Sequence, residues 1–166
     1  SSVSQCERVD VWSWKKNASK LYSYLSIPEI ASGEMRSVPV PENKEIPKFW
    51  SEVCSKDISD SGTFVLWSNI DRLSWKTGKT VETHVSELTG RMYRYFLHDS
   101  EVTINISIVN SNNPQDKIIK TPVLANDPLY LMAPTNTPEP YNKTPLFSLY
   151  GEEEKIKIKI EGVEHV

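Results

Sequence analysis

Side chains of the kinds that carry out catalysis are scattered along this sequence rather than grouped. Cys54 and His84 are the residue types of a nucleophile and its general base. Any chain of this length offers such a pair, so the pairing alone carries little weight. Four carboxylates flank the central stretch, and no spacing holds two of them at the separation of a general acid and base. They are Asp57, Asp60, Asp71 and Glu82.

Phosphate-binding and hydrolase motifs are absent from the sequence. Its six glycines form neither a GxGxxG nor a GxxxxGK[ST] loop, and no GxSxG elbow occurs. Two cysteines and three histidines give no zinc-ligand spacing. A small independent enzyme is one alternative interpretation of the chain, although the sequence contains no complete set of catalytic residues.

Aromatic and basic side chains are the next candidates for a binding surface. Four indole rings could form a ligand platform, although such rings on sheet faces more often belong to the core; they are Trp12, Trp14, Trp67 and Trp75. Four basic side chains could meet an anion or form a solvated face; they are Lys76, Lys79, Arg91 and Arg94. The net charge of −3 argues against general nucleic-acid binding, which needs a basic face.

The sequence shows no feature of membrane insertion or secretion. No segment approaches the roughly 18 consecutive apolar residues of a membrane span, and no signal-peptide pattern opens the chain. We therefore expect a cytoplasmic protein whose Cys6 and Cys54 stay reduced, although an oxidising compartment would allow them to form a disulfide. Because the chain begins without methionine in a helix-prone stretch, we expect a fragment.

Alternation of apolar and polar residues predicts several strands. Residues 8–14 and 20–27 alternate on either side of a polar turn, which indicates a β-hairpin. Residues 1–7 are expected to end a helix. Residues 62–70 are apolar on both faces, which predicts a strand buried on two sides, and residues 101–109 alternate as a half-buried strand.

One long amphipathic helix is expected over about residues 81–98. Its apolar side chains recur at helical spacing in one stripe, formed by Val81, Val85, Leu88, Met92 and Phe96. Thr80 is the expected N-cap, and Glu82 in the first turn complements the helix dipole. Gly90 is expected to allow close packing on a sheet. Together these elements predict an α+β fold with a mixed or antiparallel sheet and one long helix packed on it.

Proline-rich stretches divide the chain. Residues 28–49 hold four prolines, which predicts an extended connection, and residues 47–55 are expected to add one or two helical turns. Residues 133–145 hold four more prolines and are the expected linker. Residues 146–166 are then expected to begin a second domain, with an amphipathic strand of alternating Ile and Lys over residues 154–161.

Five segments carry a family resemblance by their order and spacing. They are SSVSQCERVDVWSW, LSIPEIASGEM with the Pro-rich stretch after it, SGTFVLWSNIDRL, ELTGRMYRYFL and LANDPLYLM. This order resembles bacterial members of the GHKL ATPase superfamily (gyrase, heat-shock chaperone, histidine kinase, MutL), especially its chaperone-like and MORC-like branch. The resemblance covers roughly residues 1–132, which would be the C-terminal half of the ATP-binding domain.

The resemblance implies a fold in which ATP lies on one face of a mixed sheet covered by helices. In that fold an early helix carries an Asn that binds magnesium and often a Glu that activates water. A following Asp recognises the adenine amino group. A glycine-rich lid leads into a helix whose N-terminus holds the phosphates. A later strand beginning Gly-Thr helps to bind the adenine edge through water, and a transducer domain donates a Lys to the γ-phosphate.

The implied cofactor-binding residues in this chain are Ser1, Ser2, Gly62 and Thr63. Ser1 and Ser2 would open the helix after the lid, and Gly62 and Thr63 would open the Gly-Thr strand, which puts Thr63 near the base. The cofactors would be ATP and magnesium in the parent protein, with no tight binding by this chain alone. Residues 146–166 would begin the transducer.

Several parts of the family pattern are missing from this sequence. The Asn/Glu helix, the adenine-reading Asp motif and the lid glycines do not occur, and no residue can be assigned as the transducer lysine. We therefore expect part of an ATPase module that couples nucleotide occupancy to conformational change or dimerisation of the parent protein. Its partners would be the remainder of the ATPase domain and a second copy. The alternative is a self-contained α+β binding module that uses aromatic sheet faces for a protein or carbohydrate partner.

Overall fold

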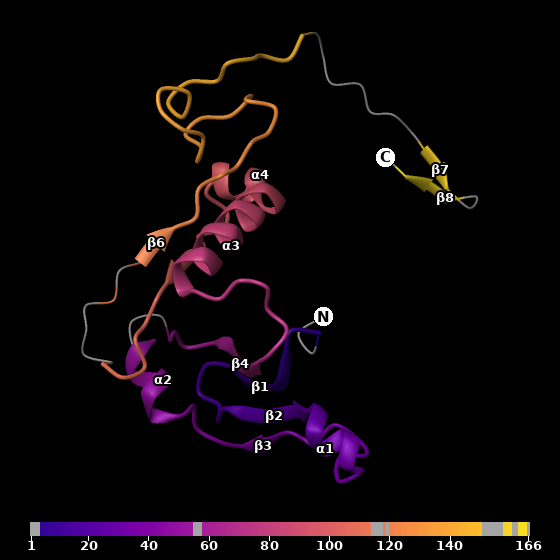
Figure 1. Cartoon of the computed structure of the whole chain (residues 1–166). Coiled ribbons are helices and arrows are strands. Elements are labelled where there is room, and N and C mark those ends of the chain that lie inside the picture. Colours follow the sequence, from indigo (N-terminus) through magenta and orange to yellow (C-terminus); the bar gives the residue numbers. More distant parts are fainter. Residues whose placement is uncertain are drawn as a thin grey trace. The chain divides into compact units, whose positions relative to one another are not determined.

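The structure, a computed structural model, contains helices and antiparallel strands (Figure 1). It describes residues 4–54, 58–113, 118 and 120–150, together with the backbone of β7 (Ile158–Ile160) and β8 (Val163–His165). The chain packs as two units, one of Ser1–Gly78 with Val109–Lys117 and one of Lys79–Ile108 with Ile118–Val166. The predicted α+β fold class is confirmed.

The first unit is built around a four-stranded antiparallel sheet in the order β3-β2-β1-β4 (Figure 1). The strands are β1 (Cys6–Trp14), β2 (Leu21–Ser26), β3 (Glu42–Asn43) and β4 (Gly62–Ile70). β1 and β2 confirm the predicted hairpin. Because β1 begins at Cys6, the expected end of a helix over residues 1–7 is wrong at its last two positions, and residues 1–3 lie outside the described part.

One face of this sheet carries an aromatic core. Trp12 and Tyr22 are 2% and 3% exposed, and their ring centroids lie 4.8 Å apart. Phe64 lies 5.5 Å from Trp12 on the other side, because the register pairs Trp12 with both residues. Trp50 of α2 (Lys48–Val53) packs against this row of rings, and α2 confirms the helical turns expected there. Rings of this size dominate the apolar area that a small sheet buries.

A short helix, α1 (Ile27–Ser32), occupies part of the segment whose prolines predicted an extended connection. The Ser26 side chain caps its first turn, and Gly33 ends it with a left-handed φ of 80°. Pro28 lies in the first turn, where the helix needs no backbone donor, so this proline favours the helix start instead of preventing it. The extended prediction for residues 28–49 is therefore wrong at α1.

The second unit combines two consecutive helices with an antiparallel strand pair. The elements are α3 (Gly78–Met92), α4 (Arg94–His98), β5 (Asn105–Ser107) and β6 (Lys120–Pro122). The predicted long helix is present but is interrupted at Tyr93. It begins at Gly78, so Thr80 lies inside the first turn and the expected N-cap is wrong.

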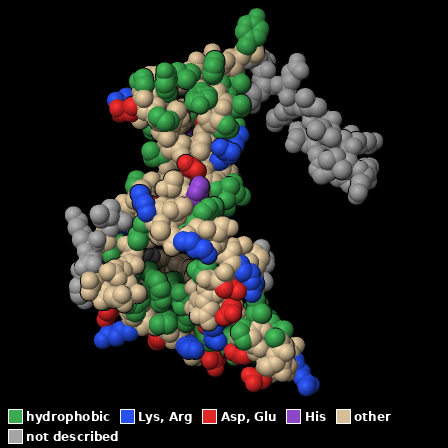
Figure 2. Space-filling model, viewed as in Figure 1, with side chains coloured by type: hydrophobic (Ala, Val, Ile, Leu, Met, Phe, Trp, Pro, Cys, Tyr) green, Lys and Arg blue, Asp and Glu red, His purple; other side chains and the backbone are tan. Residues whose placement is uncertain are grey.

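The packed side of α3 centres on Gly90. A Cβ atom at this position would lie 2.5 Å from the Leu124 backbone oxygen, and the Asn126 amide donates to the Gly90 oxygen at 3.0 Å. The close approach expected at Gly90 is present, but its partner is the backbone of residues 124–126, which follows β6, and not a sheet. The apolar stripe lies elsewhere on the helix, with Leu88 58% and Met92 67% exposed. Hydrophobic side chains also gather on the viewed surface over α4 and the segments after β6 (Figure 2).

Asp127 organises the segment that follows β6. Its side chain is 3% exposed and accepts hydrogen bonds from the amides of Leu129, Leu131 and Met132 at 3.0, 2.6 and 3.0 Å.

Within the proline-rich stretch, the Asn136 amide donates to the Ala125 oxygen at 2.9 Å. Farther along, β7 and β8 pair as a hairpin, and most of the strand expected over residues 154–161 lies outside the described residues.

Candidate functional site

The second face of the first unit's sheet is apolar and only partly covered. The register pairs Val11 with Val65 and Val9 with Trp67 on this face. Leu21 and Val65 are each 48% exposed and Trp67 is 43% exposed, whereas Val9 is 8% exposed. Burial alternates along β4, so the expectation of a strand buried on both faces is wrong. Apolar side chains occur on both faces of β4, but other side chains cover only the face that carries the aromatic core.

Two hydroxyl groups lie together at one end of this face. Ser13 of β1 and Thr63 of β4 are direct partners in the antiparallel register, and their oxygens Oγ and Oγ1 are 3.5 Å apart. Both residues are exposed. Thr63 was singled out from the sequence, whereas Ser13 was missed. Ser13 could have been found only by aligning the two strands, because it lies 50 residues away in the chain.

Gly62 faces the aromatic side of the sheet. A Cβ atom on Gly62 would lie 2.9 Å from Cζ2 of Trp14, so glycine lets β4 begin directly against the indole ring. The Trp14 Nε1 group donates to the Ser59 oxygen at 2.9 Å, which holds the ring in place. Gly62 and Trp14 thus fix the backbone immediately before Thr63. The other two residues that the resemblance implied, Ser1 and Ser2, lie outside the described residues.

The outer edge of β4 is open in the sheet that the structure describes. β1 pairs with β4 along one side, and β4 ends the strand order. Its sequence, GTFVLWSNI, contains neither the lysine nor the proline that commonly discourages further pairing at a sheet edge. A strand from another segment can therefore extend the sheet next to Thr63.

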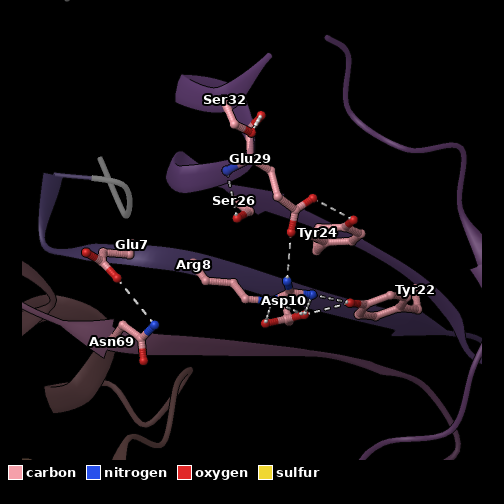
Figure 3. Close-up of polar contacts among 9 residues, drawn as sticks. All are labelled: Glu7, Arg8, Asp10, Tyr22, Tyr24, Ser26, Glu29, Ser32 and Asn69. Atoms are coloured by element: carbon pink, nitrogen blue, oxygen red, sulfur yellow. Dashed lines mark hydrogen bonds and ion pairs between the residues drawn. The ribbon is translucent and has the colours of Figure 1, made fainter. Parts of the chain in front are cut away.

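A charged cluster lies on the aromatic side of the sheet, where β1, β2 and α1 meet (Figure 3). Arg8 contacts the Asp10 carboxylate through Nε and Nη2, each at 3.0 Å, and its guanidinium lies 4.1 Å from the centre of the Tyr24 ring. Arg8 Nη1 also lies 3.4 Å from Glu29 Oε1. The Tyr22 hydroxyl donates to Asp10 at 2.6 Å, and the Tyr24 hydroxyl donates to Glu29 at 2.9 Å.

The electrostatics of this cluster indicate a structural role. Burial, followed by the hydrogen bond to Asp10, raises the pKa of Tyr22 to about 12. The hydrogen bond to Glu29 raises the pKa of Tyr24, and the hydrogen bond to Asp10 raises the pKa of Arg8. These shifts keep both tyrosines neutral and the arginine charged, so the cluster is not poised for proton transfer. Its hydrogen bonds instead hold β1, β2 and α1 together.

An open pocket of about 240 Å³, lined by residues of polar type, lies in the second unit near the start of α3. Its lining includes Lys79, Glu82 and Thr121. The Lys79 ammonium lies 2.6 Å from the Glu82 carboxylate, and Lys79 and then Thr121 lower the pKa of Glu82 by hydrogen bonding. The Glu82 carboxylate, the most buried charged group of this pocket, therefore already has its partners.

Other groupings suggested by the sequence are not assembled within either packing unit. Trp12 and Trp14 lie on one face of the sheet and Trp67 lies on the other, so these rings form no single platform. Cys54 and His84 belong to different packing units. Within the described ranges no three His, Cys, Asp or Glu side chains are placed to hold a metal ion. No described helix has the length and apolar content needed to cross a bilayer.

Comparison with known proteins adds no relative to this picture. No protein-family model, no curated protein and no solved structure matches the chain. The features of this chain from which a function can be proposed are therefore the sheet face that carries Ser13 and Thr63 and the open edge of β4.

Proposed function

We propose that this chain forms part of a GHKL-type ATP-binding module, with β1 and β4 as one wall of the nucleotide site. The observation that carries the proposal is the position of the Thr63 hydroxyl. It lies on the partly uncovered apolar face of the sheet, at the start of the strand whose outer edge is open. In the family that the sequence resembles, a threonine at the start of such a strand helps to bind the adenine edge.

The surface beside Thr63 has the chemistry of a purine site. Val11 and Val65 lie next to the hydroxyls on the same face and offer a flat apolar area. Ligand sites for small molecules are mostly apolar with a few polar groups that fix orientation. A threonine hydroxyl both donates and accepts, so it can bind a ring nitrogen or amino group directly or through an ordered water.

The remaining parts of the site would come from a polypeptide segment outside these residues. The sequence contains no Asp-x-Gly-x-Gly stretch, and no residue of this chain is assigned as a magnesium ligand. We place the additional strand at the open edge of β4 and the covering helices on the apolar face. This placement accounts for Val65 and Trp67, which are 48% and 43% exposed although their types favour burial.

In this proposal the chain couples nucleotide occupancy to movement or dimerisation of the parent protein and is not catalytically complete alone. ATP with magnesium would bind to the assembled module, and this chain would contribute the wall under the base. The partners are the rest of the ATPase domain and a second copy of the parent protein.

Calorimetry with a non-hydrolysable ATP analogue and magnesium tests the proposal on the longest native form of the protein. We expect binding by that form, none by the 166-residue chain, and a dissociation constant about 3–10-fold higher for Thr63→Ala, since a lost hydrogen bond costs about 1 kcal/mol. Thr103→Ala is the matched control, because Thr103 is an exposed threonine of the second unit. Absence of binding by the longest form would contradict the proposal.

The exposed indole of Trp67 favours a second candidate, a binding module for a protein or carbohydrate partner. Trp67 is 43% exposed beside Val65 on the apolar face, and tryptophan is enriched where proteins bind partners. The same calorimetric experiment separates the two candidates. If neither the longest native form nor the 166-residue chain binds nucleotide, and the 166-residue chain folds on its own, the binding module is favoured.

A further inference from the structure

We propose that Ser13 is a second ligand-contacting hydroxyl, which forms with Thr63 a two-hydroxyl clamp on one polar atom of the base edge or on the single water bound there. This inference rests on the proposed nucleotide-binding function and adds a residue that no part of the sequence resemblance implied. The hydroxyl pair is defined as Ser13 Oγ and Thr63 Oγ1.

The separation of the two oxygens leaves both able to contact a third group. At 3.5 Å they are farther apart than the roughly 2.7–2.8 Å of a strong hydroxyl–hydroxyl hydrogen bond. One atom can lie at about 2.8 Å from both oxygens, so the pair can grip a single ring nitrogen, amino group or water. Both residues are exposed, so such a group can reach them.

The backbone holds the hydroxyl pair in a defined position. Ser13 and Thr63 are direct register partners, one pair before the end of the β1–β4 pairing, and Thr63 is β-branched, which restricts its χ1 angle. The next register pair, Trp14 and Gly62, is fixed by the close approach of the indole ring and by its 2.9 Å hydrogen bond to the Ser59 oxygen. A preformed pair of this kind loses little conformational entropy when it binds a ligand.

The surroundings of the pair define the kind of ligand edge that it fits. Leu21 lies opposite Ser13 on the β2 side, and Val11 and Val65 are the next pair along the same face. The two hydroxyls are thus polar groups at the end of an apolar strip. An amino group at the edge of a flat ring, as on adenine, carries two N–H donors, so it can donate to both hydroxyl oxygens at once.

A double-mutant cycle in the longest native form tests whether the two hydroxyls act as one unit. We expect Ser13→Ala and Thr63→Ala each to raise the dissociation constant of the non-hydrolysable ATP analogue about 3–10-fold. The double variant should lose less than the product of the two single effects, because each single change already breaks the clamp. Ser13→Thr keeps a hydroxyl and should retain binding close to that of the unmodified protein.

A second nucleotide shows whether Ser13 contacts the ligand or only supports the structure of the sheet. We expect the unmodified protein to prefer ATP over the purine nucleotide that lacks the 6-amino group, and Ser13→Ala to reduce this preference several-fold. A change that only loosened the sheet would weaken both ligands equally and leave the preference unchanged. That result, or a dissociation constant unaffected by Ser13→Ala while Thr63→Ala weakens binding, would overturn the inference and leave Thr63 acting alone. If the unmodified protein binds neither nucleotide, the proposed function fails and this inference fails with it.

Discussion

The Tyr22 hydroxyl donates a 2.6 Å hydrogen bond to the Asp10 carboxylate across the β1–β2 hairpin. Tyr22 is 3% exposed and Asp10 is 7% exposed, so the carboxylate lies at the border of the aromatic core. Arg8, two residues from Asp10 on the same strand, supplies the opposite charge. The cost of burying the carboxylate is thereby offset by an ion pair and a charge-assisted hydrogen bond.

Tyr22→Phe should destabilise the first unit through this hydrogen bond. The ring and its packing on Trp12 are kept, while Asp10 loses one donor, which we expect to lower the unfolding free energy by about 1.5–3 kcal/mol. Urea denaturation followed by tryptophan fluorescence measures the change. Tyr24→Phe removes the same group from a half-buried position and should cost less. Equal effects of the two changes would show that burial of the Asp10 hydrogen bond does not matter.

The stability of the first unit should fall at high pH because of Tyr22. Burial and Asp10 raise the pKa of Tyr22 to about 12, whereas a tyrosine in an unfolded chain titrates near 10. The neutral form is therefore favoured by folding, and this contribution is fully present below about pH 10 and is lost as the pH rises toward 12. Urea denaturation from pH 9 to 12 should show the decline, and Tyr22→Phe should reduce its slope. An unchanged slope in that variant would assign the decline to other groups.

The strand pattern of the first unit could be predicted from the sequence because its periodicity is strong. Residues 8–14 and 62–70 alternate or run apolar over a full strand length, and both strands are present. The charged cluster could also have been anticipated, since alternation puts Asp10 on the same face as Trp12. A carboxylate among aromatic residues requires a partner, and Arg8 lies two residues away on the same face.

Features that depend on distant contacts could not be predicted from local pattern. The pairing of Ser13 with Thr63 depends on strand register, and the exposure of Val65 depends on what covers the sheet. The prolines of residues 28–49 predicted an extended connection, but Pro28 fits the first turn of a helix that Ser26 caps, so proline content alone does not indicate α1. The apolar stripe of α3 indicated a buried face, while the packed side is set by the backbone contact at Gly90.

Gly90→Ala should destabilise the second unit even though alanine is the better helix former. Alanine would contribute up to about 1 kcal/mol of helix propensity. Against this, its Cβ would lie 2.5 Å from the Leu124 oxygen, which is backbone and cannot rotate away. The helix must shift, and the 3.0 Å hydrogen bond from the Asn126 amide to the Gly90 oxygen must lengthen, so we expect a net loss of about 1–3 kcal/mol.

Leu88→Ala is the contrasting change on the same helix. Leu88 is 58% exposed, so its truncation should cost well under the roughly 2–5 kcal/mol of a buried leucine. Thermal unfolding of both variants, followed by far-ultraviolet circular dichroism, gives the comparison. If Gly90→Ala raised the melting temperature while Leu88→Ala lowered it strongly, the apolar stripe and not the glycine side would be the packed face of α3. A strongly lowered melting temperature for Gly90→Ala and a small change for Leu88→Ala would establish that the helix packs through its closest backbone contact.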